Sequence, residues 1–238
     1  PGETQTLGIW VAPGTKASKQ QKYIEELVKS LPKSSSIDLM LDPGNDYFLP
    51  FRWLGFKVSP RITYRFADVS DIEAIRNKYD KTVRKNIKSA RNKVEIIEED
   101  NIDNLHALLV KTFEHQGRSC PHKKEFINSI FEACSAHDGA KVITAKDKDG
   151  NVHASSMFVY DEKTCYYLIA GADPAFRASG APTLVLDYGI EFASKNSKSF
   201  DFEGSMIEGI ENFFRRFGAD RVLYYQIEKK GFIGELKS

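Results

Sequence analysis

The sequence lacks long apolar runs and a strong excess of charge, and these absences exclude several classes of protein. No apolar run approaches the roughly 20 residues that a membrane-spanning helix needs, so we expect no transmembrane segment. The 34 basic and 33 acidic residues leave a formal net charge of only +1, and we expect no DNA partner.

Cysteine and histidine are also sparse. Cys120, Cys134 and Cys165 are odd in number and show no C-x-x-C spacing, which favours reduced thiols over a disulfide or zinc framework. The five histidines form no metal-ligand pattern, so we predict no metal site. We expect a cytoplasmic protein without a tightly bound cofactor, and the inner face of the membrane is one place where it could act.

The sequence contains alternating strand and helix patterns after about residue 60. A composition of 41% hydrophobic and 28% charged residues fits a folded α/β (α+β) protein with a mixed central sheet flanked by helices. The predicted strands are 62–69, 94–98, 140–147, 152–161, 164–171, 199–203 and 220–230. The predicted helices are 71–93 with a break near Asp80, 102–116, 123–137, 182–196 and one beginning at Ser205.

An internal repeat relates the first 60 residues to the end of the chain. "SIDLM" at 36–40 is similar to "SFDFE" at 199–203, and "FRWLGF" at 51–56 to "FRRFGA" at 214–219, both 163 residues apart. Chance similarity between such short strings is the alternative. We interpret 61–238 as a complete domain and 1–60 as the end of an incomplete first copy. Roughly a hundred residues would then precede Pro1 in the native protein.

The segment "SFDFEGSMIEGIENFFRRFGAD" at 199–220 places two carboxylates at a strand end. Alternation sends Phe200 and Phe202 to one face of the strand, and Asp201 and Glu203 to the other. Ligands of α/β sheets bind at the carboxyl ends of strands, where a partly buried carboxylate can accept a proton. Asp201 and Glu203 are therefore catalytic candidates. The alternative is that they are solvated or paired with an arginine.

Helical sequence follows this strand. Ser205 and Glu208 have the spacing of a capping box, and Gly218 is placed to end the helix. The apolar stripe predicted for this helix consists of Ile207, Ile210, Phe214 and Phe217.

These features together resemble the GNAT superfamily of acyltransferases. The resemblance rests on the order of the predicted strands and helices and on two segments, "DFEGS…FFRRFGA" and "DPAFRASGAPTLVLDYGIEFA". The Fem-type branch, which has two GNAT-like domains in tandem, is the most similar, and its architecture would explain the repeat. The resemblance implies transfer of an acyl group to an amine. In Fem-type proteins the donor is aminoacyl-tRNA and the acceptor a peptidoglycan precursor, whereas ordinary GNAT enzymes use acetyl-CoA.

The resemblance also implies candidate donor contacts in "RASGA" at 177–181, a shortened match to the GNAT pyrophosphate loop. Backbone amides, a helix N-terminus and an arginine would suit a phosphate, but Pro182 lacks an amide hydrogen. The candidate cofactor-binding residues are Arg177, Ser179, Gly180 and Ala181. Arg177 as a plain exposed loop residue is the alternative.

Fem-type sequences often carry a lysine three residues before the phenylalanine of a terminal F-G. This chain has Phe214 there, so we take the neighbouring Arg215 as the third catalytic candidate. The substrate-binding candidates beside the strand end are Tyr167, Gly204 and Ser205, with core packing as the alternative for Tyr167.

Residues 76–93 form a basic helical stretch with eight lysines or arginines and one aspartate. At helical spacing, Val83, Ile87 and Ala90 share one face. The basic face consists of Lys81, Arg84, Lys88 and Arg91, and the substrate-binding candidates here are Arg84, Lys85, Lys88 and Arg91. The face could bind the phosphates of tRNA, of a nucleotide-linked wall precursor or of a membrane surface, or it could simply be solvated.

We therefore predict a Fem-like acyltransferase acting on an amine of a small molecule or a peptidoglycan precursor. The donor would be aminoacyl-tRNA or acyl-CoA, and tRNA is a potential partner. Two alternatives remain open: an acetyl-CoA-dependent N-acetyltransferase, and a catalytically silent module that binds a wall precursor or a nucleotide.

Overall fold

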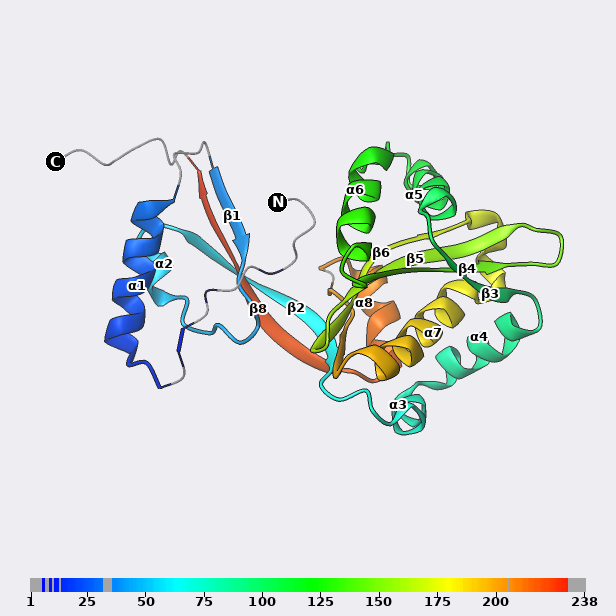
Figure 1. Ribbon diagram of the computed structural model, residues 1–238, viewed down its shortest axis with the longest axis horizontal. Coiled ribbons are helices and arrows are strands. Elements are labelled where there is room, and N and C mark those ends of the chain that lie inside the picture. Colours follow the sequence, from blue (N-terminus) through cyan, green and yellow to red (C-terminus); the bar gives the residue numbers. More distant parts are fainter. Residues whose placement is uncertain are drawn as a thin grey trace. The chain divides into compact units, whose positions relative to one another are not determined.

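The computed structural model describes residues 6, 9, 11–12, 14–31, 36–204 and 206–230 (Figure 1). The chain forms two compact units. One contains the residues up to Thr63 and those from Arg221 onward, and the other is Tyr64–Asp220. No helix in the described ranges is both long and apolar enough to cross a membrane.

The strand order of the mixed sheet is β1-β8-β2-β7-β6-β5-β4-β3. β6 and β7 are parallel, whereas β3, β4, β5 and β6 are antiparallel to one another in turn. The strands are β1 (Ser36–Met40), β2 (Lys57–Phe66), β3 (Glu95–Glu99), β4 (Ala140–Lys146), β5 (Val152–Tyr160), β6 (Thr164–Ala172), β7 (Ser199–Asp201) and β8 (Asp220–Lys230). The helices are α1 (Ala17–Ser30), α2 (Leu49–Trp53), α3 (Ile72–Lys78), α4 (Lys81–Arg91), α5 (Asp103–His115), α6 (Lys124–Ser135), α7 (Ala181–Asn196) and α8 (Glu208–Phe214), with 3-10 turns η1 (Pro174–Ser179) and η2 (Arg215–Phe217).

In the unit Tyr64–Asp220, helices cover both faces of the sheet (Figure 1). α5 and α6 lie on one face, where Leu105 and Ile127 pack against Val142 and Met157. α7 lies on the other face with α4 beside it. Gly189 of α7 allows this close approach, because a Cβ there would lie 2.2 Å from the ring of Phe158. The core therefore occupies two layers, one on each side of the strands.

The helix and strand boundaries follow local sequence signals. The side chains of Asp71 and Asp80 cap α3 and α4, which explains the predicted break in the basic helical stretch. Val83, Ile87 and Ala90 are buried, as their spacing predicts. β2 begins at Lys57, five residues before the predicted start.

The other unit is assembled from distant parts of the chain. Ile24 and Val28 of α1 pack with Ile37 of β1 and Ile227 of β8. β1 pairs with β8 in antiparallel register, from Ser36↔Lys230 to Met40↔Gln226. Gln226 also donates a 2.7 Å hydrogen bond from Nε2 to Asp38.

The 163-residue spacing of the sequence repeat also separates the starts of corresponding strands. β1 and β7 begin at Ser36 and Ser199, and β2 and β8 begin at Lys57 and Asp220, both pairs 163 residues apart. Gly55 and Gly218 have the same spacing, and both adopt left-handed conformations, with φ of 80° and 74°. These correspondences support the proposed duplication, while the division into domains 1–60 and 61–238 stays a prediction.

The three thiols differ sharply in access. Cys165 is fully buried in β6, and this burial raises its pKa, whereas Cys120 and Cys134 are half-buried. Because the thiolate is the reactive form, we expect Cys120 and Cys134 to react with an aromatic disulfide reagent in the native protein. Cys165 should react only after unfolding. Equal reaction rates for all three thiols in the native protein would contradict this expectation.

Candidate functional site

The first candidate site lies where β7 ends. Asp201 is 3% exposed and is held by Arg65 of β2, whose Nη2 and Nε lie 2.7 Å and 2.8 Å from its Oδ2. Its other oxygen, Oδ1, accepts a 2.8 Å hydrogen bond from the backbone N–H of Glu203. Both carboxylate oxygens of Asp201 are therefore hydrogen-bonded, which agrees with the alternative that this residue is paired with an arginine. Its bond to the Glu203 N–H also fixes the start of the turn that carries Glu203.

Glu203 is half-buried and has a left-handed backbone with φ of 64°, followed by Gly204 with φ of 62°. Residues other than glycine rarely adopt this conformation, and such strain clusters at functional sites. The alternation predicted that Glu203 is the last residue of a regular strand. That prediction is wrong, because β7 ends at Asp201. The backbone turns out of β7 and presents Glu203 at the end of the strand.

The predicted helix start differs as well. α8 begins at Glu208 with Ile207 as N-cap and no side-chain cap, so Glu208 does not occupy the third helical position of a capping box. Ser205 lies outside the described residues. Phe214 and Phe217 are buried, but Ile207 and Ile210 are 61% and 41% exposed, so only half of the predicted stripe packs into the core.

Arg215 lies on the surface near this turn. Its Nη1 is 3.5 Å from Oε2 of Glu211, and Oε1 of Glu211 accepts a 2.5 Å hydrogen bond from the hydroxyl of Tyr64. The arginine beside the strand-end carboxylates is Arg65, which sequence analysis missed. Its signal was weak, because Arg65 is a single polar residue between Tyr64 and Phe66, both buried.

Tyr166 and Tyr167 point to opposite faces of β6. Tyr166 is the register partner of Asp201 and is close enough to Arg65 and Glu203 to feel their charges, although burial is the main cause of its raised pKa. Tyr167 packs in the core against Phe158 and Phe214, at ring distances of 5.5 Å and 5.9 Å, and burial raises its pKa to about 12. A ligand would have to displace Phe214 to reach Tyr167.

The glycine loop before α7 is closed by its own contacts. The N–H of Ala181 donates to Oγ of the buried Ser179, and the N–H of Thr183 donates to the carbonyl of Gly180. Gly180 has φ of 79°, and a Cβ there would lie 2.6 Å from the backbone oxygen of Asn86 in α4. Because Pro182 has no amide hydrogen and the N–H of Ala181 is bonded to Ser179, two consecutive positions offer no free amide to a pyrophosphate. Arg177 is exposed and, together with Phe176 and Pro182, lines a cavity beside the loop.

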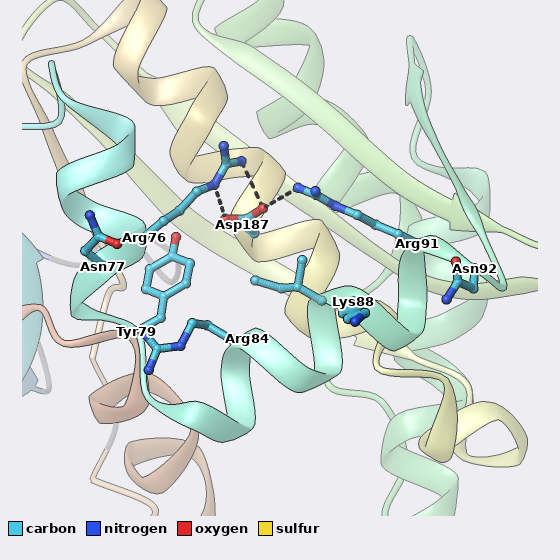
Figure 2. Close-up of a pocket in the computed structure, with 9 residues that line it drawn as sticks. Arg76, Asn77, Tyr79, Arg84, Lys88, Arg91, Asn92 and Asp187 are labelled. Atoms are coloured by element: carbon cyan, nitrogen blue, oxygen red, sulfur yellow. Dashed lines mark hydrogen bonds and ion pairs between the residues drawn. The ribbon is translucent and has the colours of Figure 1, made fainter.

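The basic helix contributes to a pocket of about 410 Å³ rather than only to a surface (Figure 2). Arg84, Lys88 and Arg91 line it from α4, but Lys81 and Lys85 do not. Arg76 and Tyr79 line the pocket from α3 and its C-terminal end, and Asp187 lines it from α7. None of these three was predicted to be a site residue. The lining residues are Arg76, Asn77, Tyr79, Arg84, Ile87, Lys88, Arg91, Asn92 and Asp187.

Asp187 anchors this pocket. It is 1% exposed and accepts two 3.0 Å hydrogen bonds from Arg76, one to each oxygen, and Nη2 of Arg91 lies 3.5 Å from its Oδ2 (Figure 2). Nη2 of Arg76 also lies 2.7 Å from Oε2 of Glu191. These carboxylates hold Arg76 in its charged form. The sequence signal was a charged residue within the apolar run of "TLVLDYGI".

Comparison with known proteins places this geometry in a family. Residues 77–215 match the sequence profile described as "Acetyltransferase (GNAT) domain". No curated protein compared with the chain is similar to it in sequence.

Solved structures share the fold at low sequence identity. FemX is 13% identical with a TM-score of 0.67, over 87% of this chain and 75% of that chain. The C-terminal domain of a protein described as a lysylphosphatidylglycerol synthetase, from Agrobacterium fabrum, is 11% identical with a TM-score of 0.60, over 88% and 72%. A tandem GNAT protein from the clavulanic acid biosynthesis pathway is 11% identical with a TM-score of 0.56, over 93% and 73%. The Fem-like, GNAT-type fold predicted from the sequence is confirmed, and the chain belongs to the acetyltransferase (GNAT) domain family of acyltransferases.

Proposed function

We propose that the chain transfers an aminoacyl group from aminoacyl-tRNA to an amine of a cell-envelope precursor. The closed glycine loop carries this proposal. The GNAT fold uses acyl-CoA as co-substrate, but here the N–H of Ala181 is bonded to Ser179, Pro182 has no N–H, and Asn86 of α4 lies against Gly180. These features disfavour binding of the CoA pyrophosphate at this loop. The likeness of the fold to FemX, and the basic residues of α4, favour a different polyanionic donor.

The residues at the end of β7 suit attack by an amine on an ester. In this proposal the amine nitrogen forms a bond to the carbonyl carbon, and the bond from that carbon to the ribose oxygen breaks. Glu203 takes a proton from the attacking amine and gives it to the departing ribose oxygen, which becomes a hydroxyl and leaves Glu203 as a carboxylate again. Asp201, fixed by Arg65, holds the backbone of Glu203 and so orients its carboxylate.

The donor can be tested by titrating acetyl-CoA and aminoacyl-tRNA separately into the protein. We expect no saturation by acetyl-CoA at about 1 mM, and tRNA binding that weakens steeply as salt is raised, because phosphate contacts release counterions. Arg177→Ala should leave both results unchanged. Acetyl-CoA binding at about 1 μM that is lost in Arg177→Ala would instead support the acetyl-CoA-dependent alternative.

A further inference from the structure

The pocket between α3, α4 and α7 has the composition of an anion site. Four cationic side chains line it, those of Arg76, Arg84, Lys88 and Arg91, against the single carboxylate of Asp187. Asp187 and Glu191 bind Arg76. Among the described residues, Arg84 and Lys88 form no ion pair within 4.0 Å, and both side chains are exposed. Positive charge therefore remains uncompensated on the α4 side of the pocket.

A second, independent observation points to a ligand. Tyr79 is 2% exposed, and burial, with the nearby carboxylate of Asp187, raises the pKa of its hydroxyl. The hydroxyl nevertheless forms no hydrogen bond within 3.5 Å with a described residue. The ring is fixed by an edge contact with Phe217 at 5.1 Å, and Figure 2 shows the hydroxyl directed toward the side of the pocket that holds Arg76 and Asp187. Buried hydroxyls are nearly always hydrogen-bonded, so a hydroxyl in a pocket wall that has Asp187 nearby but no bond within 3.5 Å has room for a ligand as its partner.

The donors in this pocket suit phosphate better than carboxylate. Arg84, Lys88 and Arg91 are spaced at four and three residues along α4, so they lie on one face of the helix, and all three line the pocket. Asn77 and Asn92 add amide groups at its ends. A phosphate has enough oxygen atoms to accept from several such donors at once, and arginine binds it with two parallel hydrogen bonds.

We propose that this pocket binds a phosphate group, with Arg84, Lys88 and Arg91 as its charged contacts and Tyr79 as a buried donor. The phosphate could belong to the RNA backbone of the donor or to a phosphorylated small molecule. The first source rests on the proposed function, but the pocket itself does not. Arg76 has a positioning role, because it is held between Asp187 and Glu191 and joins α3 to α7.

Two probes test the proposal: deacylated tRNA, followed by fluorescence anisotropy at several salt concentrations, and inorganic pyrophosphate, followed by calorimetry. Arg84→Ala and Lys88→Ala should each weaken the bound probe about tenfold. For tRNA, each should also lower the slope of log affinity against log salt by about one. Lys81→Ala is the matched control, because it removes the same charge from the same helix but outside the pocket, and it should change affinity by less than about twofold.

Tyr79→Phe supplies a readout that a purely structural role would not give. Removing a buried hydroxyl that forms no hydrogen bond within 3.5 Å should change Tm little. If the hydroxyl binds the ligand, the same variant should weaken the probe about threefold or more. A lower Tm with unchanged affinity for the probe would show that Tyr79 has only a structural role.

The outcomes distinguish the proposal of a phosphate pocket from the proposal that aminoacyl-tRNA is the donor. Binding of tRNA that depends on the pocket residues supports an RNA phosphate. Pocket-dependent binding of pyrophosphate without tRNA binding supports a small phosphorylated ligand and overturns aminoacyl-tRNA as donor. If neither probe binds, or if Lys81→Ala matches the pocket variants, the phosphate pocket is wrong.

Discussion

Replacing Asp187 with asparagine is expected to lower the free energy of unfolding by about 3 kcal/mol. The substitution removes the most buried of the carboxylates that pair with Arg76, because the side chain of Asp187 is only 2% exposed. Arg76, at 23% exposure, has limited access to water and would keep only the more exposed Glu191 and Glu73 as charged partners, so losing the buried pair is costly. Chemical denaturation followed by circular dichroism measures this change.

Glu73→Gln is the matched control for that variant. Glu73 contacts the same arginine at 3.3 Å, but its side chain is 77% exposed. A solvent-exposed pair of this kind contributes at most about 0.5 kcal/mol. If Asp187→Asn cost no more than Glu73→Gln, the buried carboxylate would not be what holds α3 and α7 together.

Replacing Glu203 with glutamine is expected to lower kcat by about a hundredfold or more, while the fold is retained. Glutamine has nearly the same shape but cannot accept the proton of the attacking amine. A single-turnover assay with the donor that binds measures the loss directly. Glu208→Gln is the control, because Glu208 lies on the same segment but is exposed in the first turn of α8.

The backbone of Glu203 gives this prediction a second test. Glycine adopts a φ of 64° without the steric cost of a side chain, so Glu203→Gly should relieve the strain at this position and retain the fold. The same variant should be as inactive as Glu203→Gln. A folded and fully active variant would remove Glu203 from the mechanism.

Most of the fold could be predicted because its signals are local. The apolar spacing of Val83, Ile87 and Ala90 identifies the buried face of α4, and the Asp-Gly turn at Asp149 and Gly150 separates β4 from β5. Asp80 marks the break before α4, since a short acidic side chain caps the next helix. Such patterns require no knowledge of distant contacts.

The turn at the end of β7 could not be predicted in the same way. Ser205 and Glu208 have capping-box spacing, but spacing alone does not show that Glu203 and Gly204 adopt left-handed conformations. Those conformations delay the helix until Glu208. The hydrogen bond from the Glu203 N–H to Asp201 depends on how Arg65 fixes that carboxylate, and Arg65 is 136 residues away in sequence.

The basic pocket could not be predicted from local sequence patterns either. The charges of Arg84, Lys88 and Arg91 were visible as one helical face, but their meeting with Tyr79 and Asp187 depends on how α4 packs against α7. The pairing of Arg76 with Asp187 spans 111 residues. Pairs that are so far apart in sequence are set by tertiary packing.

The discontinuous unit has a consequence for the order of folding. Asp38 of β1 meets Gln226 of β8 across 188 residues, whereas the unit Tyr64–Asp220 is one continuous stretch. Long-range strand pairing carries a large loop-closure entropy and forms slowly. During synthesis the continuous stretch can fold as soon as it leaves the ribosome, because domains fold as units in order of emergence. β1 must wait for its partner until β8 has been made, and in that interval it is exposed to pairing with another chain.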